Sequence, residues 1–136
     1  MISFNYETNF ELENSNFISN WISNTITKEN CVEGEINYIF CTDEYLHKIN
    51  LDFLNHDTLT DIISFDYTVG KELHGDIYIS IDRVKENASE FAVEFNNELA
   101  RVMIHGILHY CGYKDKSKEE KKEMRLKEDF YLSKQN

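Results

Sequence analysis

Residues 105–115 read HGILHYCGYKD, and this stretch organises the rest of the chain. His105 and His109 are four residues apart in a helical pattern, so both imidazoles lie on one face of a helix and can reach one ion. Gly112 adopts a left-handed backbone at low cost, so we expect it to end the helix and return Asp115 toward the histidines. The stretch predicts three ligands for one metal ion, with the open fourth position typical of catalytic zinc.

The helix that carries these histidines is apolar around most of its circumference, which predicts that it is buried near the middle of the domain. Its apolar residues are Leu99, Val102, Met103, Ile104, Ile107, Leu108 and Cys111. An imidazole without a partner would be costly in such a helix, which favours metal binding. Cys111 is a rival ligand, but it lies about 200° round the helix from His109, so we expect it in the core.

Other polar residues are weaker candidates for this site. His74 could assist from the loop before a predicted strand. Asp76 could orient a ligand histidine by a hydrogen bond to the nitrogen that does not bind metal, or it could close a turn. We expect His47 and His56 to be ordinary surface or loop residues.

The remaining pattern mixes strands and helices, so neither an all-α nor an all-β protein is expected. Alternating or β-branched runs predict four strands, at residues 2–6, 35–40, 61–67 and 76–81. Helical spacing predicts five helices: residues 14–28, Thr42 or Asp43 to about Leu51, residues 82–95, Asn96-Asn97 to about Cys111, and a last one from Ser117 onward. The 136 residues, 41% of them hydrophobic, are the right size for one domain spanning residues 1–136.

The charge is strongly negative but unevenly spread. The net charge of −11 argues against nucleic-acid binding by a general basic surface. Residues 114–127, however, hold seven basic side chains against four acidic ones, directly after the predicted metal site. This excess fits either a solvated helix face with alternating charges or a local contact for a polyanion.

The cysteines and the chain start indicate a soluble protein of a reducing compartment. Three cysteines without a CxxC pair indicate neither a disulfide framework nor a thiolate zinc site. The N-terminus has no basic leader followed by an apolar run, and no apolar stretch approaches about 18 residues. We therefore expect a cytoplasmic protein without a membrane contact.

Taken together, these motifs resemble those of the YbeY family of bacterial endoribonucleases. The HGILH sequence of residues 105–109, Gly112-Tyr113 and a ligand six residues after His109 carry the likeness, and residues 57–65 and 75–77 are similar to the family's upstream segments. The resemblance implies a zincin-like α+β domain with a mixed sheet of about four strands and about five helices. These elements would surround a central helix that carries one zinc ion.

Three positions depart from the family pattern. The family's usual third ligand is histidine, whereas this chain has Asp115, a residue type that zinc also accepts. Leu54 stands where the family typically has an arginine thought to handle RNA phosphate, and Leu59 replaces a usual proline.

The resemblance implies a zinc-dependent endoribonuclease specific for single strands, which matures the 3′ end of small-subunit (16S) ribosomal RNA and takes part in ribosome quality control. Metal-bound water would act, with no side chain identified as general base. Lys114, Lys116 and Lys118 would contact RNA, and the small ribosomal subunit would be the partner. Two alternatives are a zinc metallopeptidase or amide hydrolase and a non-catalytic ribosome-associated factor with structural zinc. Gly106 weakens the peptidase reading, because HExxH proteases have their general-base glutamate there.

Overall fold

The computed structural model describes residues 1–135, which form a mixed sheet with five helices. The elements in chain order are β1 (Ile2–Tyr6), α1 (Ser15–Lys28), β2 (Val32–Cys41), α2 (Asp43–Leu54), β3 (Ile62–Asp66), β4 (Glu72–Ser80), α3 (Ile81–Glu90), α4 (Phe95–Tyr110) and α5 (Lys118–Leu132). The strand order is β1-β2-β4-β3, in which only the β3–β4 pair is antiparallel. The expected α+β fold with a four-stranded mixed sheet is confirmed.

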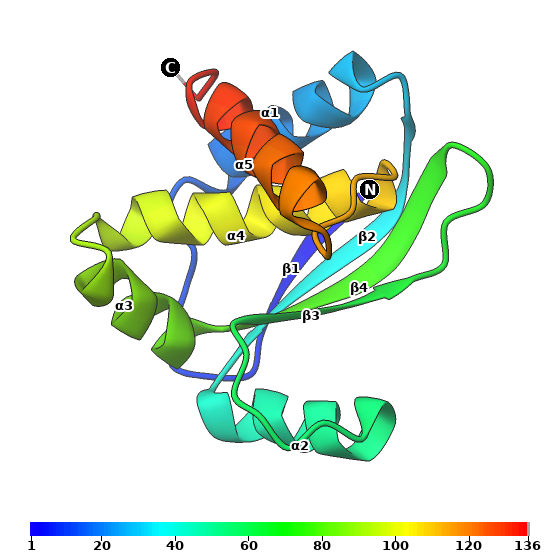
Figure 1. Ribbon diagram of the computed structural model, residues 1–136. Helices are drawn as coiled ribbons and strands as arrows, with labels where there is room; N and C mark the ends of the chain where they lie inside the picture. The colour runs from blue at the N-terminus through cyan, green and yellow to red at the C-terminus, as the bar shows by residue number, and fades with distance from the viewer. Residues whose placement is uncertain (136) are drawn as a thin grey trace.

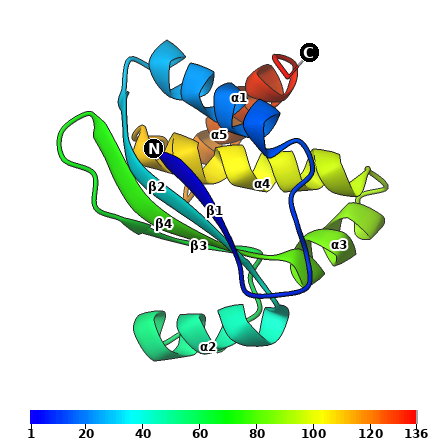
Figure 2. The same cartoon turned by 180° about the vertical axis from the view of Figure 1, so that it is seen from behind.

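The helices cover the two faces of the sheet unequally. Helices α1, α4 and α5 lie on one face and α2 lies on the other, while α3 packs beside the first turns of α4 (Figure 1, and from behind in Figure 2). The alternation of β4 turns Ile77 and Ile79 into the core. They meet α4, whose Met103, Ile104 and Ile107 are completely buried. Helix α4 therefore occupies the middle of the fold, as its apolar circumference predicts.

Close contacts with the sheet fix the rotation of α4. A Cβ atom at Gly106 would lie 3.0 Å from Cδ1 of Ile77, so the helix backbone lies almost against the strand. The Tyr38 hydroxyl donates to the carbonyl of Met103 (2.8 Å), and the Tyr110 hydroxyl donates to the carbonyl of Phe65 (2.9 Å). His105 directly precedes Gly106, and His109 directly precedes Tyr110. Neighbouring residues of a helix are about 100° apart around its axis, so the two histidines lie on the side of α4 and not on the face that contacts the sheet.

The connection between α3 and α4 differs from the sequence prediction. A single helix was expected to reach Phe95, but α3 ends at Glu90 and Ala92 has a left-handed backbone with φ 55°. Helix α4 begins at Phe95 after Glu94, so the predicted break and cap at 96–97 are wrong. This turn could not be predicted from the sequence, because alanine rarely adopts positive φ.

Candidate metal centre

The three predicted ligands come together in the structure. Oδ2 of Asp115 lies 3.2 Å from Nε2 of His105 and 3.2 Å from Nε2 of His109. One candidate ligand atom from each residue lies within 4.8 Å of the other two. Ligand atoms around a tetrahedral zinc ion with bonds of about 2.0–2.1 Å are separated by about 3.3 Å. The spacing of these three donors therefore fits a zinc-sized ion.

The turn after α4 positions Asp115. Gly112 has φ 107°, which strongly favours glycine. Its N–H donates to the carbonyl of His109, and the N–H of Tyr113 donates to the carbonyl of Leu108, both at 3.0 Å. This pair of bonds is the Schellman motif, which ends the helix and reverses the chain. The glycine turn expected from the sequence thus returns the carboxylate to the histidine face.

Both histidines make a hydrogen bond through Nδ1, which turns their Nε2 atoms toward Asp115. Nδ1 of His109 lies 2.9 Å from the carbonyl oxygen of Tyr113, which can only accept, so this nitrogen carries a proton. Nδ1 of His105 lies 2.6 Å from Oε2 of Glu128. With both protons on Nδ1, two nitrogen lone pairs and the carboxylate of Asp115 converge on one point. Such a cluster of acceptors is suited to a positive ion.

Glu128 links the face of α4 that carries the candidate ligands to α5. Its side chain is 7% exposed, and its Oε1 accepts a bond of 2.9 Å from Arg101, which also donates to Asp129 at 2.7 Å. Burial lowers the pKa of His105, but the hydrogen bond and charge of Glu128 outweigh burial, with help from Asp115, and the pKa is raised. Glu128 thus favours a proton on His105 and holds the ring in place.

Sequence reasoning missed Glu128, although a signal was present. Glu128 follows the buried Met124 by four residues and precedes the buried Tyr131 by three, so it lies on the inner face of α5. A carboxylate on an apolar helix face needs a partner. In the sequence, however, it is one of many charges in residues 114–129 and does not stand out.

The three candidate ligands line a cavity of about 490 Å³ that is also lined by the half-buried Asp61 and the buried Glu98. Burial raises the pKa of Asp61, although the charge of His105 opposes this effect. Burial also raises the pKa of Glu98, and the charge of Asp61 adds to the rise. Neither residue was singled out from the sequence. Asp61 comes near α4 only through the tertiary fold, whereas Glu98 lies on α4 itself, seven residues before His105, so helical spacing was a signal for it. Both carboxyl groups line the cavity of the candidate ligands, and burial favours their protonated form.

Two other candidates, His74 and Asp76, lie on β4 and do not join this group. Strand β4 starts at Glu72, four residues before the predicted start, so His74 is in a strand rather than a loop. Nε2 of His74 lies 3.0 Å from Oε2 of Glu72. The carboxylate of Asp76 accepts a hydrogen bond of 3.0 Å from the side-chain amide of Asn37. The carboxylate that contacts a ligand histidine through its second nitrogen is Glu128 instead.

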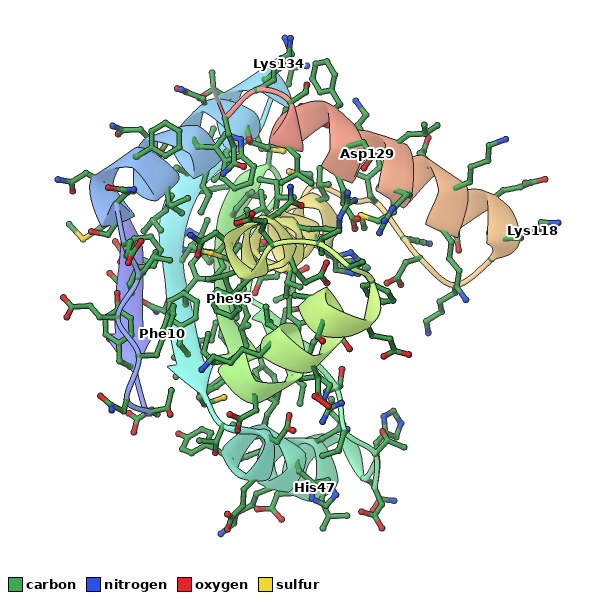
Figure 3. The ribbon with its side chains drawn as sticks, turned by 90° about the vertical axis from the view of Figure 1, so that its left-hand side faces the viewer. Phe10, His47, Phe95, Lys118, Asp129 and Lys134 are labelled. Carbon is green, nitrogen blue, oxygen red and sulfur yellow. The ribbon has the colours of Figure 1, made fainter. Side chains whose placement is uncertain are left out.

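The remaining histidines and Cys111 also lie apart from the ligands. His47 lies on α2, on the opposite side of the sheet from α4 (Figure 3), and pairs with Asp57 at 2.7 Å. His56 is exposed in the loop after α2. Cys111 ends α4 and packs against the main core, and burial raises its pKa far above that of an ordinary thiol. A thiol held protonated in this way is a poor metal ligand.

The three predicted RNA-contacting lysines and Leu54 do not line the cavity of the candidate metal centre. Lys114, Lys116 and Lys118 are exposed on the loop and at the first residue of α5. Leu54 ends α2 and lines a second, shallower cavity of about 290 Å³. The two cavities share the wall formed by Thr60, Ile62 and Ser64. Leu54 therefore lines a neighbouring cavity and not the one that contains the candidate ligands.

Curated relatives match this chain over nearly its full length. An Endoribonuclease YbeY from Flavobacterium johnsoniae is 64% identical over 129 residues, which cover 95% of this chain and 93% of the relative. The protein of the same name from Flavobacterium psychrophilum is also 64% identical, covering 95% and 92%. One from Cytophaga hutchinsonii is 49% identical, covering 96% and 92%.

A solved structure and a family model agree with these relatives. The solution structure of TM1509 from Thermotoga maritima has a TM-score of 0.70 and 29% identity, and the likeness covers 99% of this chain and 89% of that one. The family model described as Endoribonuclease YbeY matches residues 2–136. The resemblance noted from the sequence motifs is confirmed, and the chain belongs to the Endoribonuclease YbeY family.

Proposed function

We propose that this protein is a zinc-dependent endoribonuclease that acts in ribosomal RNA maturation. The observation that carries the proposal is the convergence of His105, His109 and Asp115 in a cavity, in a chain that matches the Endoribonuclease YbeY family from residue 2 to residue 136. Two imidazoles and one carboxylate form a three-ligand set that leaves a position open for reaction. Metal-assisted hydrolysis of a phosphodiester is the chemistry that fits both observations.

The side chains of the cavity have different roles in the proposed reaction. A zinc ion held there would supply positive charge to the scissile phosphate and would acidify a water molecule. Glu128 and the carbonyl of Tyr113 keep Nε2 of each histidine directed at the ion. Asp61, whose pKa burial raises, is placed to accept a proton within the cavity.

The size of the cavity favours a single strand as the substrate. A cavity of about 490 Å³ accommodates a nucleotide, whereas a duplex would have to open before one of its nucleotides could enter. Within this proposal, the substrate is the 3′ end of 16S ribosomal RNA and the partner is the small ribosomal subunit in the cytoplasm. One domain, residues 1–136, performs the reaction. In residues 1–135, no helix has the length and apolar character needed to cross a membrane.

The direct test is His109→Ala, with His47→Ala as the matched control because His47 lies on α2 away from the cavity. We expect His109→Ala to lose bound zinc and cleavage of a single-stranded RNA oligonucleotide, while His47→Ala keeps both. Unchanged zinc and cleavage in His109→Ala would overturn the proposal.

Two further measurements separate the alternatives. Hydrolysis of casein by the zinc-loaded protein, without cleavage of RNA, would favour a peptidase. The thermal unfolding of His109→Ala distinguishes catalytic from structural zinc. Loss of activity with an unchanged unfolding temperature supports a catalytic ion, since removing a structural ion also lowers stability.

A further inference from the structure

The side chains that line the metal cavity carry more negative than positive charge. The lining includes four carboxylates and two guanidinium groups, namely Asp61, Glu98, Asp115 and Glu128 against Arg101 and Arg125. The carboxyl groups outnumber the guanidinium groups by two, an excess of acidic groups that a divalent ion would only balance. An RNA strand brings a negative phosphate at every nucleotide. Binding of that strand therefore needs a cation beyond the metal ion.

Arg101 already forms ion pairs with two carboxylates of the protein. Its guanidinium donates to Glu128 at 2.9 Å and to Asp129 at 2.7 Å, and its side chain is 15% exposed. Both bonds join α4 to α5 and support the carboxylate that orients His105. Using Arg101 to bind RNA would require breaking this support, so Arg101 is not the missing cation.

Arg125 is available for a phosphate. Its side chain is 63% exposed, and its ion pair with Glu128 is 3.9 Å long, beyond hydrogen-bond range. It lies on α5, one turn before Glu128, and it lines the cavity. A planar guanidinium with free donors binds a phosphate through two parallel hydrogen bonds.

A second exposed side chain of the cavity wall has the chemistry to bind a base. Phe91 lies at the end of α3, is 58% exposed and lines the same cavity. Figure 3 shows α3 and α5 on different sides of α4, so Phe91 and Arg125 belong to different walls. An exposed phenyl ring beside a metal centre has no evident role in stability, but it offers a surface on which a nucleobase stacks.

We propose that single-stranded RNA binds across the cavity with a phosphate on Arg125 and a base stacked on Phe91. This inference rests on the proposed function and specifies how the substrate is held. In this binding mode the principal RNA contacts are Arg125 and Phe91. They are not the exposed lysines at 114, 116 and 118, because these lysines do not line the cavity. These two side chains would position a backbone linkage of the RNA beside the ion that His105, His109 and Asp115 would hold.

The test compares Arg125→Ala and Phe91→Ala with two matched controls. Lys122→Ala removes one positive charge from the same helix outside the cavity, and Phe53→Ala removes an exposed ring from α2. Lys118→Ala is measured beside them as the test of the lysine contact expected from the sequence. For each variant, kcat/KM for a labelled single-stranded RNA oligonucleotide is measured between about 50 and 200 mM salt. Zinc content and thermal unfolding are measured alongside, and both are expected to remain at wild-type values.

The two variants should differ in their response to salt. We expect Arg125→Ala to lower kcat/KM about tenfold at low salt and to reduce the slope of log(kcat/KM) against log salt by about 0.7, because one phosphate contact is lost. Arg125→Lys should keep the slope and recover part of the rate. Phe91→Ala should lower kcat/KM about tenfold without changing the slope, and Phe91→Trp should restore it.

The outcomes separate this inference from the proposed function. If the wild type cleaves RNA but Arg125→Ala and Phe91→Ala match their controls, the binding mode is wrong and the proposed function stands. The same conclusion follows if Lys118→Ala shows the larger loss of slope. If zinc-loaded wild type cleaves no RNA, the proposed function fails, and the binding mode fails with it.

Discussion

Nδ1 of His105 and Oε2 of Glu128 lie 2.6 Å apart and join two helices across 23 residues of sequence. The bond connects the face of α4 that carries the candidate ligands to the inner face of α5, and Arg101 holds the carboxylate from its other side. Helix α5 therefore supports the geometry of the candidate metal centre as well as covering the core.

Replacing Glu128 should weaken zinc binding without removing it. Glu128→Gln keeps the shape of the side chain but removes the charge that fixes the proton on Nδ1 of His105, so we expect zinc affinity to fall about 10- to 100-fold. Asp129→Asn is the matched control, because Asp129 also binds Arg101 but does not contact His105. Competition with a chromophoric chelator measures both affinities, and equal values for the two variants would show that Glu128 has no orienting role.

Removing the third ligand should have a larger effect. Asp115→Ala leaves two histidines, and we expect the protein to be purified with well under one zinc per chain. Asp115→His supplies another zinc ligand type and should retain the ion. Elemental analysis of gently purified protein measures the content, with Lys116→Ala as the control on the same loop. Full zinc content in Asp115→Ala would exclude this carboxylate as a ligand.

Glycine at position 75 is required for α4 to dock on the sheet. A Cβ atom there would overlap the phenol of Tyr110 and the carbonyl of Phe65. We expect Gly75→Ala to lower the free energy of unfolding by about 2–4 kcal/mol, because the ring next to His109 must move. Tyr110→Phe loses only the hydroxyl bonds, and about 1–2 kcal/mol is expected. Urea denaturation gives both values, and a smaller loss for Gly75→Ala would contradict the steric argument.

The sequence was most informative where the determining interactions are local. The spacing of His105 and His109, the turn at Gly112 and the return of Asp115 all lie within eleven residues, and helical geometry and glycine conformation suffice to predict them. The helix predicted from Ser117 onward is also present, because the capping box that starts it pairs Ser117 with Glu120, only three positions away.

The rest of the site depends on contacts between distant parts of the chain. Glu128 and Asp61 reach the histidines from α5 and from the residue before β3, and no periodicity in the sequence pairs them with α4. The α3–α4 turn was missed because the surrounding fold imposes a positive φ on Ala92. Asp76 was considered as a partner for a histidine, but its place on β4 puts it beside Asn37.

Glu29 should make stability depend on pH, and it also supports the metal-binding loop. Its carboxylate accepts hydrogen bonds from Tyr113 (2.7 Å), Tyr131 and Lys127 (3.4 Å). Burial raises the pKa of Glu29, but these three donors outweigh burial and hold it below its ordinary value of 4.5. Tyr113 also supplies the carbonyl that binds His109, so Glu29 anchors the residue that orients a ligand.

The sign of the pH dependence follows from this lowered pKa. Ionised Glu29 contributes stability that is fully present above pH 4.5 and is lost as the pH falls through the folded-state pKa. Glu29→Gln has no ionised carboxylate and lacks this stabilisation. We therefore expect the free energy of unfolding of the wild type to be higher by about 1–3 kcal/mol at pH 7 and the difference to shrink below pH 4.5. Urea denaturation of both proteins at pH 7, 5.5 and 3.5 measures the difference, with Glu13→Gln as an exposed control. A difference that is constant over this range, or that grows in acid, would show that the ionised carboxylate does not stabilise the folded state.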